Sequence, residues 1–307
     1  MYDIVGDIHG HAAELEALLT KMGYRQGECG WRHPARKVIF LGDFIDRGPE
    51  QCKTVAIARA MVESGQALAV MGNHEFNAVA YATPDPDRDG QHLRPHTEKN
   101  CGQHQRYLDQ VGEGSALHRE HIAWFKTLPL YLDLPEFRVV HACWHPEQLD
   151  KIAPYIDERQ RIREYAWPML TRLGEAGFEA LETLLKGLEI PLPQGHSFFD
   201  KDRNPRCHIR SQWWNRAAVT YRDLALVPEE AMARIPHTPV PADILPGYDG
   251  HKPVFVGHYW LTGTPAPLDE HIACLDYSVV AKDGGKLCAY RWDGKQTLSA
   301  ERFCWVE

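Results

Sequence analysis

The chain has 307 residues, of which 44% are hydrophobic and 25% charged, a composition ordinary for a globular protein of one large or two small domains. No apolar run reaches the roughly 18 residues of a membrane helix, and the N-terminus MYDIVGDIHG lacks the features of a secretory signal. The net charge of −8 argues against a general nucleic-acid or anionic-membrane binder, and eight cysteines without a CxxC pair favour reduced thiols in the cytoplasm.

The first 80 residues alternate between strand and helix patterns. Apolar runs at 2–5, 37–41 and 67–71 predict buried strands, and the spacing of apolar residues predicts helices at 11–22 and 50–63. Strands joined by helices imply right-handed crossovers and a largely parallel sheet. Each strand is followed by glycine and a polar residue, and ligands bind beyond the carboxyl ends of the strands in such sheets.

The rest of the chain predicts one domain, 1–307, interrupted by an insertion at 150–250. Residues 83–106 are polar and rich in Pro, Asp and His, which predicts a long loop. Residues 150–190 have a helical pattern and few strand signals, and 191–250 are Pro-rich and irregular, so the insertion is expected to form a helical and irregular cap. The other expected elements are a helix at 118–127 and strands at 137–140, 254–256, 271–276, 286–292 and 297–306.

Five polar clusters follow predicted strands and supply potential metal ligands. They are GDIHG (6–10), GDFIDRG (42–48), GNHE (72–75), His141 and His258. Asp7 and His9 are two residues apart and point the same way in an extended segment, so together they could hold one cation. Asp43 could bridge two cations through its two oxygens. The second cation would then be completed by Asn73, His141 and His258.

These residue types suit the hydrolysis of phosphate esters. Mixed carboxylate, amide and imidazole ligands favour manganese, iron or zinc over calcium. Two metal ions about 4 Å apart lower the pKa of a water between them from 15.7 toward ~7, which provides hydroxide to attack phosphorus. Arg47 can hold phosphoryl oxygens with two parallel hydrogen bonds. His74 can protonate the leaving group while Asp46 orients its ring.

The five clusters resemble the phosphoprotein-phosphatase branch of the calcineurin-like metallophosphoesterases, whose signature is GDxHG, GDxxDRG, GNHE, a His after a strand and a final Gly-His. All five are present in the family's order over residues 6–258. The resemblance implies an α/β fold, a β-sandwich flanked by helices, with a helical insertion. It also implies two divalent metal ions, manganese in first place and iron, zinc or nickel as alternatives.

The resemblance also assigns roles to single residues. One metal takes Asp7, His9 and Asp43, and the other takes Asp43, Asn73, His141 and His258. Arg47 contacts the phosphate, and the His74–Asp46 pair is the general acid. The family uses a second phosphate-binding arginine between the last two histidines, for which Arg210 is the first candidate and Arg206 the second.

The chain departs from the family in two places. His141 is followed by Ala-Cys-Trp-His-Pro, and a long segment separates it from His258. Both departures indicate a bacterial-type member similar to the diadenosine-tetraphosphate hydrolases. Within that segment we expect the basic stretch 200–214 to lie over the mouth of the site and supply positive charge to the substrate. Its basic residues are Lys201, Arg203, Arg206 and Arg210.

Several of these residues also allow simpler interpretations. Asp7 and Asn73 could each cap a helix, and Arg47 could form a surface salt bridge. The aromatic pair 213–214 either stacks on a nucleobase or packs in the core. The histidines of the predicted loop, His92, His96 and His104, are expected to be solvated. Cys143 and His145, which flank His141, are expected to serve in packing.

The leading function is the hydrolysis of phosphate monoesters, on a phosphoprotein or a small phosphorylated compound, by hydroxide held on the two metals. A dinucleoside-polyphosphate hydrolase is the alternative, which the Trp-Arg stretch favours. A third possibility, a metal-binding scaffold without catalysis, would not need His74 or Arg47, and both are present. The net charge disfavours a nuclease, so we expect a phosphorylated substrate as partner, no membrane and no nucleic acid.

Overall fold

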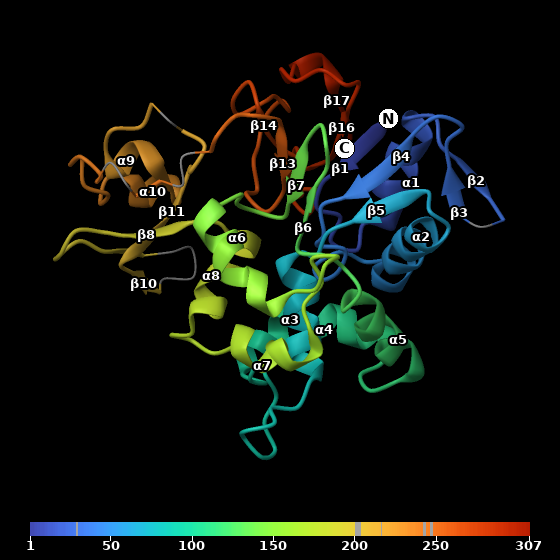
Figure 1. The fold of residues 1–307 in the computed structure, drawn as a ribbon, viewed down its shortest axis with the longest axis horizontal. Helices are drawn as coiled ribbons and strands as arrows, with labels where there is room; N and C mark the ends of the chain where they lie inside the picture. Colours follow the sequence, from blue (N-terminus) through green and yellow to red (C-terminus); the bar gives the residue numbers. More distant parts are fainter. Residues whose placement is uncertain (29, 200–203, 216, 242–243, 246–247) are drawn as a thin grey trace.

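The computed structural model describes residues 1–28, 30–199, 204–215, 217–241, 244–245 and 248–307. Two β-sheets form its centre (Figure 1). The first sheet has the order β15 (Asp276–Tyr277), β16 (Lys286–Arg291), β1 (Tyr2–Val5), β4 (Lys37–Phe40) and β5 (Ala67–Ala69), and β17 (Phe303–Val306) also pairs with β16. The second sheet has the order β14 (Ile272–Cys274), β13 (Val254–Val256), β7 (Arg138–Val140) and β6 (Tyr131–Asp133).

The three N-terminal strands and their helices form as the sequence predicts. β1, β4 and β5 are parallel neighbours, with Val5 opposite Phe40 and Phe40 opposite Ala69. Each strand leads into a helix: α1 (Ala12–Lys21), α2 (Gln51–Glu63) and α3 (Asn73–Ala82). This connection aligns the carboxyl ends of the three strands at one edge of the sheet.

Alternating side chains of the strands divide the core into two layers. Ile4 and Ile39 belong to a fully buried cluster shared with Val139 and Phe255 of the second sheet. Their neighbour Val5 packs instead into the larger cluster that includes the buried faces of α1 and α2. Because successive residues of a strand face opposite sides, one sheet serves both layers. The predicted β-sandwich flanked by helices is therefore confirmed.

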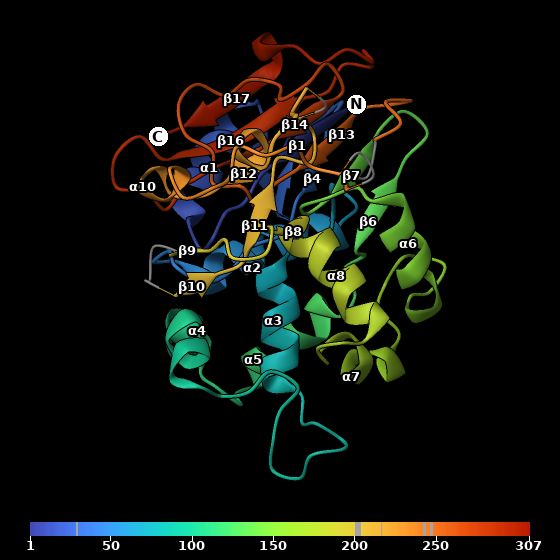
Figure 2. The ribbon, with the colours of Figure 1, turned by 90° about the vertical axis from the view of Figure 1, so that its left-hand side faces the viewer.

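Residues 83–106, predicted as one loop, contain the start of a helix. α4 (Glu98–Val111) is capped by Thr97, whose hydroxyl accepts a hydrogen bond from the Asn100 amide, and α5 (Ala116–Phe125) follows it. The prediction was wrong from residue 98 onward, because α4 is polar on all but a narrow stripe. The remaining residues, 83–97, form the connection between α3 and α4, and part of this connection extends from the body in both ribbon views (Figure 2). The buried stripe of α4 is His104, Tyr107, Leu108 and Val111.

The segment 150–250 is only partly helical. Its helices are short and interrupted: α6 (Pro146–Ile152), α7 (Trp167–Leu170), α8 (Ala176–Lys186), α9 (Tyr221–Leu224) and α10 (Glu229–Met232). It also contains a three-stranded sheet of β12 (Ala225–Leu226), β11 (His208–Ser211) and β8 (Glu189–Pro191), and a pair of β9 (Phe198–Phe199) with β10 (Pro205–Arg206). Strands of two to four residues are too short to give an alternating pattern. In Figure 1 the part of the segment that contains these strands, α9 and α10 extends to the left. It has a small core of its own around Ile190, Ile209 and Leu224.

Shorter elements complete the described chain. They are the antiparallel pair β2 (Arg25–Gly27) and β3 (Gly30–Arg32) and the single 3-10 turns η1 (Ala153–Tyr155), η2 (Glu164–Ala166) and η3 (Ala300–Arg302). Across the described ranges, every helix falls short of the length and apolarity required to cross a membrane.

Candidate metal centre

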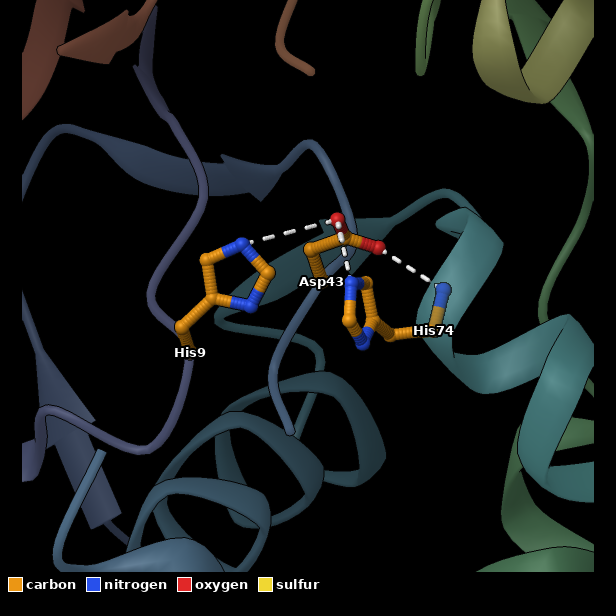
Figure 3. A group of neighbouring side chains, drawn as sticks. All are labelled: His9, Asp43 and His74. Carbon is orange, nitrogen blue, oxygen red and sulfur yellow. Dashed lines mark hydrogen bonds and ion pairs between the residues drawn. The ribbon is translucent and has the colours of Figure 1, made fainter. Parts of the chain in front are cut away.

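The six residues predicted as metal ligands lie together at the carboxyl ends of five strands from both sheets, and all six are buried. Two overlapping groups have donor atoms within 4.8 Å of one another: His9, Asp43 and His74, and Asp43, His141 and His258. Asp43 belongs to both groups. Figure 3 shows its carboxylate between His9 and His74, with one oxygen facing both rings. His74 thus lies beside the cluster, although the sequence pattern assigns it another role.

Backbone carbonyls orient two of the imidazoles. His9 donates its Nδ1–H to the Ile45 carbonyl at 3.0 Å, and His141 donates its Nδ1–H to the Leu41 carbonyl at 2.7 Å. Their Nε2 atoms are left facing Asp43 Oδ2, at 3.7 and 3.4 Å. A metal-binding histidine commonly donates its other ring nitrogen in this way, which fixes both its orientation and its tautomer.

Asn73 lies between the other two histidines. Its carboxamide Oδ1 is 2.8 Å from His258 Nδ1 and 3.2 Å from His141 Nε2. Asp7 is joined to the same group through the His258 amide, which donates to Asp7 Oδ2 at 3.0 Å. Carboxylate, carboxamide and imidazole donors therefore converge on one buried volume.

The buried carboxylates of this cluster favour the binding of a cation. Burial, followed by the neighbouring Asp276, raises the pKa of Asp7 well above its usual range. Burial opposes the protonation of His141, but the Asp43 carboxylate outweighs it and raises the pKa of His141 to about 10. A proton held this firmly beside a carboxylate marks a position where positive charge is favoured, and metal binding displaces such protons.

Three buried atoms of the cluster that could bind a metal have no hydrogen-bond partner among the described residues. They are Asp7 Oδ1, His9 Nε2 and His258 Nε2. A buried polar atom without a partner costs roughly 1–3 kcal/mol, so such atoms need a ligand. Glycines keep the space around the carboxylates free. A Cβ at Gly257 would lie 2.1 Å from Asp7 Oδ1, and one at Gly72 would lie 2.2 Å from Asp43 Oδ1. The residues present therefore fit divalent cations.

The backbone of the site loops is strained. Of the eight non-glycine residues with positive φ in the described part of the chain, six lie in or beside the cluster. This conformation is unfavourable for residues with a Cβ and persists where the surroundings fix it, most often at functional sites. The six residues are His9, Asp43, Asp46, Arg47, His258 and Trp260.

Beside the cluster, Asp46 is shared by two histidines. His74 donates its Nδ1–H to Asp46 Oδ2 at 2.5 Å, and His104 donates its Nδ1–H to Asp46 Oδ1 at 2.8 Å. Burial alone would raise the pKa of Asp46, but these two hydrogen bonds outweigh it and hold the pKa well below its usual range. Burial alone would lower the pKa of His74, but Asp43 and Asp46 outweigh it and raise the pKa above its usual range. The expectation that His104 is solvated was wrong, because α4 buries it against Asp46.

Helix α4 also holds the strained loop that follows Asp46. Arg106 donates to the Arg47 carbonyl, and Gln110 donates to the Pro49 carbonyl at 2.7 Å while it accepts from the Gln51 amide at 2.8 Å. With the His104 bond, α4 fixes this loop at four points. No sequence pattern indicated this support, because the polar residues that provide it interrupt the apolar spacing by which a helix is predicted.

Glu75, the last residue of GNHE, was assigned no role from the sequence. Its carboxylate accepts hydrogen bonds from the amides of Asp43 and Phe44, both at 2.8 Å, and of Gly72 at 3.1 Å. Burial and the nearby Asp43 raise its pKa to about 7. Glu75 thereby fixes the loop that carries Asp43 to the start of α3. Its place in the motif was the available signal.

The cluster opens into a cleft of about 1680 Å³, lined on one side by α3 and α4 and on the other by the insertion. Arg47 enters it with its guanidinium 4.1 Å above the Trp260 ring. Arg210 lines the same cleft, and its buried Nε is without a hydrogen-bond partner among the described residues. Arg206 lines it too, but pairs with Glu189 at 3.2 Å.

The other expectations for the insertion have different outcomes. Trp213 and Trp214 are 2% and 6% exposed and pack against Tyr259, so they serve the core and are not available to stack on a nucleobase. Cys143 and His145 are buried beside His141, as expected for packing residues. Lys201 and Arg203 of the basic stretch lie outside the described residues.

The model of the family described as calcineurin-like phosphoesterase matches residues 2–155, which contain four of the five polar clusters and half of the chain. The chain therefore belongs to the calcineurin-like phosphoesterase family, and the resemblance predicted from the clusters is confirmed. Membership implies dependence on divalent metal ions, in agreement with the fit of the cluster to cations.

The curated relatives include bacterial asymmetrical bis(5'-nucleosyl)-tetraphosphatases. That of Oceanobacillus iheyensis is 29% identical over 141 residues, 46% of this chain and 54% of that protein. That of Bacillus subtilis is 27% identical over 155 residues, 49% of this chain and 60% of that protein. The chain thus matches little more than half the length of these relatives.

Solved structures show the fold of this family over nearly the whole chain. A protein serine/threonine phosphatase from Saccharomyces cerevisiae has a TM-score of 0.51 at 13% identity, over 99% of this chain and 78% of that one. A cold-active protein tyrosine phosphatase has a TM-score of 0.50 at 14% identity, over 94% of this chain and 73% of that one. At such identities the likeness concerns the fold alone.

Proposed function

We propose that this protein is a metal-dependent phosphohydrolase that cleaves dinucleoside polyphosphates. The observation that carries the phosphohydrolase function is the His74–Asp46 pair beside a buried cluster of metal donors, with Arg47 at the edge of the cleft. The names of the bacterial relatives support the dinucleoside substrate. The sequence alone placed the hydrolysis of phosphate monoesters first and that of dinucleoside polyphosphates second; the proposal reverses this order.

In this proposal the six predicted ligands would hold two divalent metal ions, and Asp43 belongs to both groups of donor atoms. Such ions would polarise the phosphoryl group and lower the pKa of a nucleophilic water. Manganese as the native metal and a cytoplasmic location stay predictions from the sequence. The six ligands are Asp7, His9, Asp43, Asn73, His141 and His258.

The chain's own side chains supply the remaining chemistry. Arg47 is held over the Trp260 ring, and its guanidinium can donate two parallel hydrogen bonds to phosphoryl oxygens. Arg210, across the cleft, is a second donor to the phosphate. His74 carries its proton toward the leaving oxygen while Asp46 fixes its ring. Each of these groups acts on charge that develops as the bond to phosphorus breaks.

A second candidate is the hydrolysis of phosphate monoesters, including those of phosphoproteins. The size of the cleft favours it, because about 1680 Å³ exceeds the roughly 300–1,000 Å³ usual for small-molecule sites. A cleft of this size leaves room for a surface segment of another protein.

The two candidates are separated by comparing kcat/KM for diadenosine tetraphosphate and for a phosphoserine peptide, with manganese added to metal-stripped protein. We expect diadenosine tetraphosphate to be preferred by at least ~10-fold, since each charge-assisted hydrogen bond to its additional phosphates contributes about one such factor. A preference for the peptide would replace the first proposal with the second. Failure to hydrolyse either substrate with any divalent metal would refute both.

A further inference from the structure

One wall of the cleft carries positive charge that the mechanism above does not use. Arg94, from the segment before α4, and Lys99, Gln103 and Arg106 of α4 all line the cleft. The three α4 residues are spaced by four and three positions, which places them on one face of the helix. The family's sequence clusters do not include this wall, because it lies between GNHE and His141.

The partners of Arg94 are all neutral. Its Nη1 donates to Asn77 Oδ1 at 2.7 Å, and its Nη2 donates to Asn100 Oδ1 and Gln103 Oε1, both at 3.0 Å. Carboxamide oxygens fix the guanidinium without neutralising it. Three hydrogen bonds also leave two of its five N–H groups for another acceptor.

The opposite wall is different. There Lys186 pairs with Glu182, and Arg206 pairs with Glu189. Within the described ranges no carboxylate forms an ion pair with Arg94, Lys99 or Arg106 on the α4 wall. Positive charge without an ion-pair partner, in a chain of net charge −8, favours an anionic ligand.

Arg94 lies beside His74, the proposed proton donor. It lines a small polar cavity of about 20 Å³ together with Asp46, His74 and His104. His74 is the proposed proton donor to the leaving oxygen, so a leaving group that reaches past His74 meets Arg94 next. Asn77, one turn beyond His74 on α3, lines both this cavity and the cleft.

We propose that Arg94, assisted by Lys99 and Arg106, binds the leaving phosphate of a phosphoanhydride and makes the site selective for anhydrides over simple monoesters. This inference rests on the proposed phosphohydrolase function. Hydrolysis forms a P–O bond to the oxygen of water and breaks the P–O bond to the bridging oxygen. The bridging oxygen keeps the bonding pair and leaves on the second phosphate, while the protons of the water pass to the product phosphates and solvent. Arg94 faces the charge that this step adds to the leaving phosphate.

A purely structural role for Arg94 gives a different expectation. The same hydrogen bonds join residues 83–97 to α3 and α4, so a substitution could loosen the protein and lower activity on every substrate alike. The ratio of two kcat/KM values measured on one preparation removes this effect, because the folded fraction cancels. The experiment therefore uses inorganic tripolyphosphate, which has a leaving phosphate, and p-nitrophenyl phosphate, which has none.

For Arg94→Ala we expect kcat/KM on tripolyphosphate to fall about 10- to 100-fold, and on p-nitrophenyl phosphate by less than about threefold. Arg94→Lys should recover part of the loss, since charge is kept but the planar fork is not. Arg88→Ala is the matched control, because Arg88 lies in the same segment, is 59% exposed and pairs with Asp85. Its substrate ratio should equal that of the wild type.

Equal losses on both substrates, or no loss on either, would overturn the assignment of Arg94. Diadenosine tetraphosphate is measured alongside, so that the two proposals can fail separately. A wild type that cleaves tripolyphosphate but not diadenosine tetraphosphate refutes the dinucleotide substrate, and Arg94 is still decided on tripolyphosphate. A wild type that cleaves p-nitrophenyl phosphate and no anhydride refutes the subsite as well.

Discussion

The two walls of the cleft are connected to the metal centre in different ways. The α4 wall is bonded directly to the loop that carries Asp46 and Arg47, through His104, Arg106 and Gln110. The insertion wall has a small core of its own. It meets the centre beside two of the ligands: the Ala142 amide next to His141 donates to the Leu184 carbonyl at 2.9 Å. Next to His258, Tyr259 packs against Trp213 and Trp214. Changes on the first wall should therefore alter the chemical step, and changes on the second should alter substrate binding.

The largest effect should come from the proton donor itself. For His74→Asn we expect kcat on an alkyl phosphate to fall about 10²- to 10⁴-fold, as is typical when a general acid is removed. The loss should be much smaller on p-nitrophenyl phosphate, whose leaving group needs little protonation. Metal content, measured by elemental analysis, should stay at the wild-type level. Equal losses on good and poor leaving groups would exclude His74 as the acid.

A smaller effect of the same kind should follow from His104, which reaches the substrate only through Asp46. For His104→Leu we expect kcat on an alkyl phosphate to fall about 10- to 100-fold, the range for residues that orient a catalytic group. The loss of kcat in His104→Leu should depend on the leaving group in the same way as the loss in His74→Asn. His104→Gln can still donate to Asp46 and should recover part of the rate.

The control for His104 lies on the same helix. Gln105 is exposed and bonds to Asp109 one turn away, so Gln105→Ala should leave kcat and its leaving-group dependence as in the wild type. A His104→Leu enzyme with an ordinary kcat but a raised KM would contradict the comparison of the walls, because it would place the α4 effect in binding.

The difference between the walls also explains what the sequence could predict. The strands and the polar clusters that follow them form a strong pattern, because strands such as β4 bury three consecutive apolar residues and the ligand residues follow within a few positions. Each of the six predicted ligands lies in the buried group. The roles of these ligands stay predictions, but their proximity follows from strand topology alone.

The α4 wall was missed for a physical reason. A helix that supports a polar site loop needs His, Arg and Gln on the face that contacts it, and these residues remove the apolar periodicity by which helices are recognised. The alternation of short strands such as β11 was equally invisible, because four residues give two inward positions. Support for a site comes from residues far apart in sequence, which a local pattern does not contain.

The insertion wall should act through binding, and Arg210 tests this. For Arg210→Ala we expect KM to rise by about 10-fold with kcat changed much less, because one charge-assisted hydrogen bond to phosphate is removed. The effect should be the same for good and poor leaving groups. Arg206→Ala is the matched control on this wall, because Arg206 is already paired with Glu189 and should change KM by less than about twofold. An unchanged KM for Arg210→Ala on all substrates would move the second phosphate contact elsewhere.

The last prediction concerns stability and distinguishes the walls by pH. His121 of α5 forms a hydrogen bond with the hydroxyl of Tyr107 on α4 at 3.2 Å. Burial, then Arg59 and His118, lower its pKa from 6.5 to about 4. Because the folded pKa is below the unfolded one, the unfolded chain binds more protons between these values. The contribution of neutral His121 to the free energy of unfolding is therefore complete above pH about 6.5 and is lost as the pH falls toward about 4.

The test compares the wild type with His121→Gln, which can still bond to Tyr107 but does not titrate. Urea midpoints measured across this pH range should fall more steeply for the wild type than for the variant. Hydrogen exchange at pH 5 should show α4 and α5 opening before β8 and β11. If the urea midpoints of the wild type and of His121→Gln fall in parallel with pH, His121 does not make the stability of the α4 wall depend on pH.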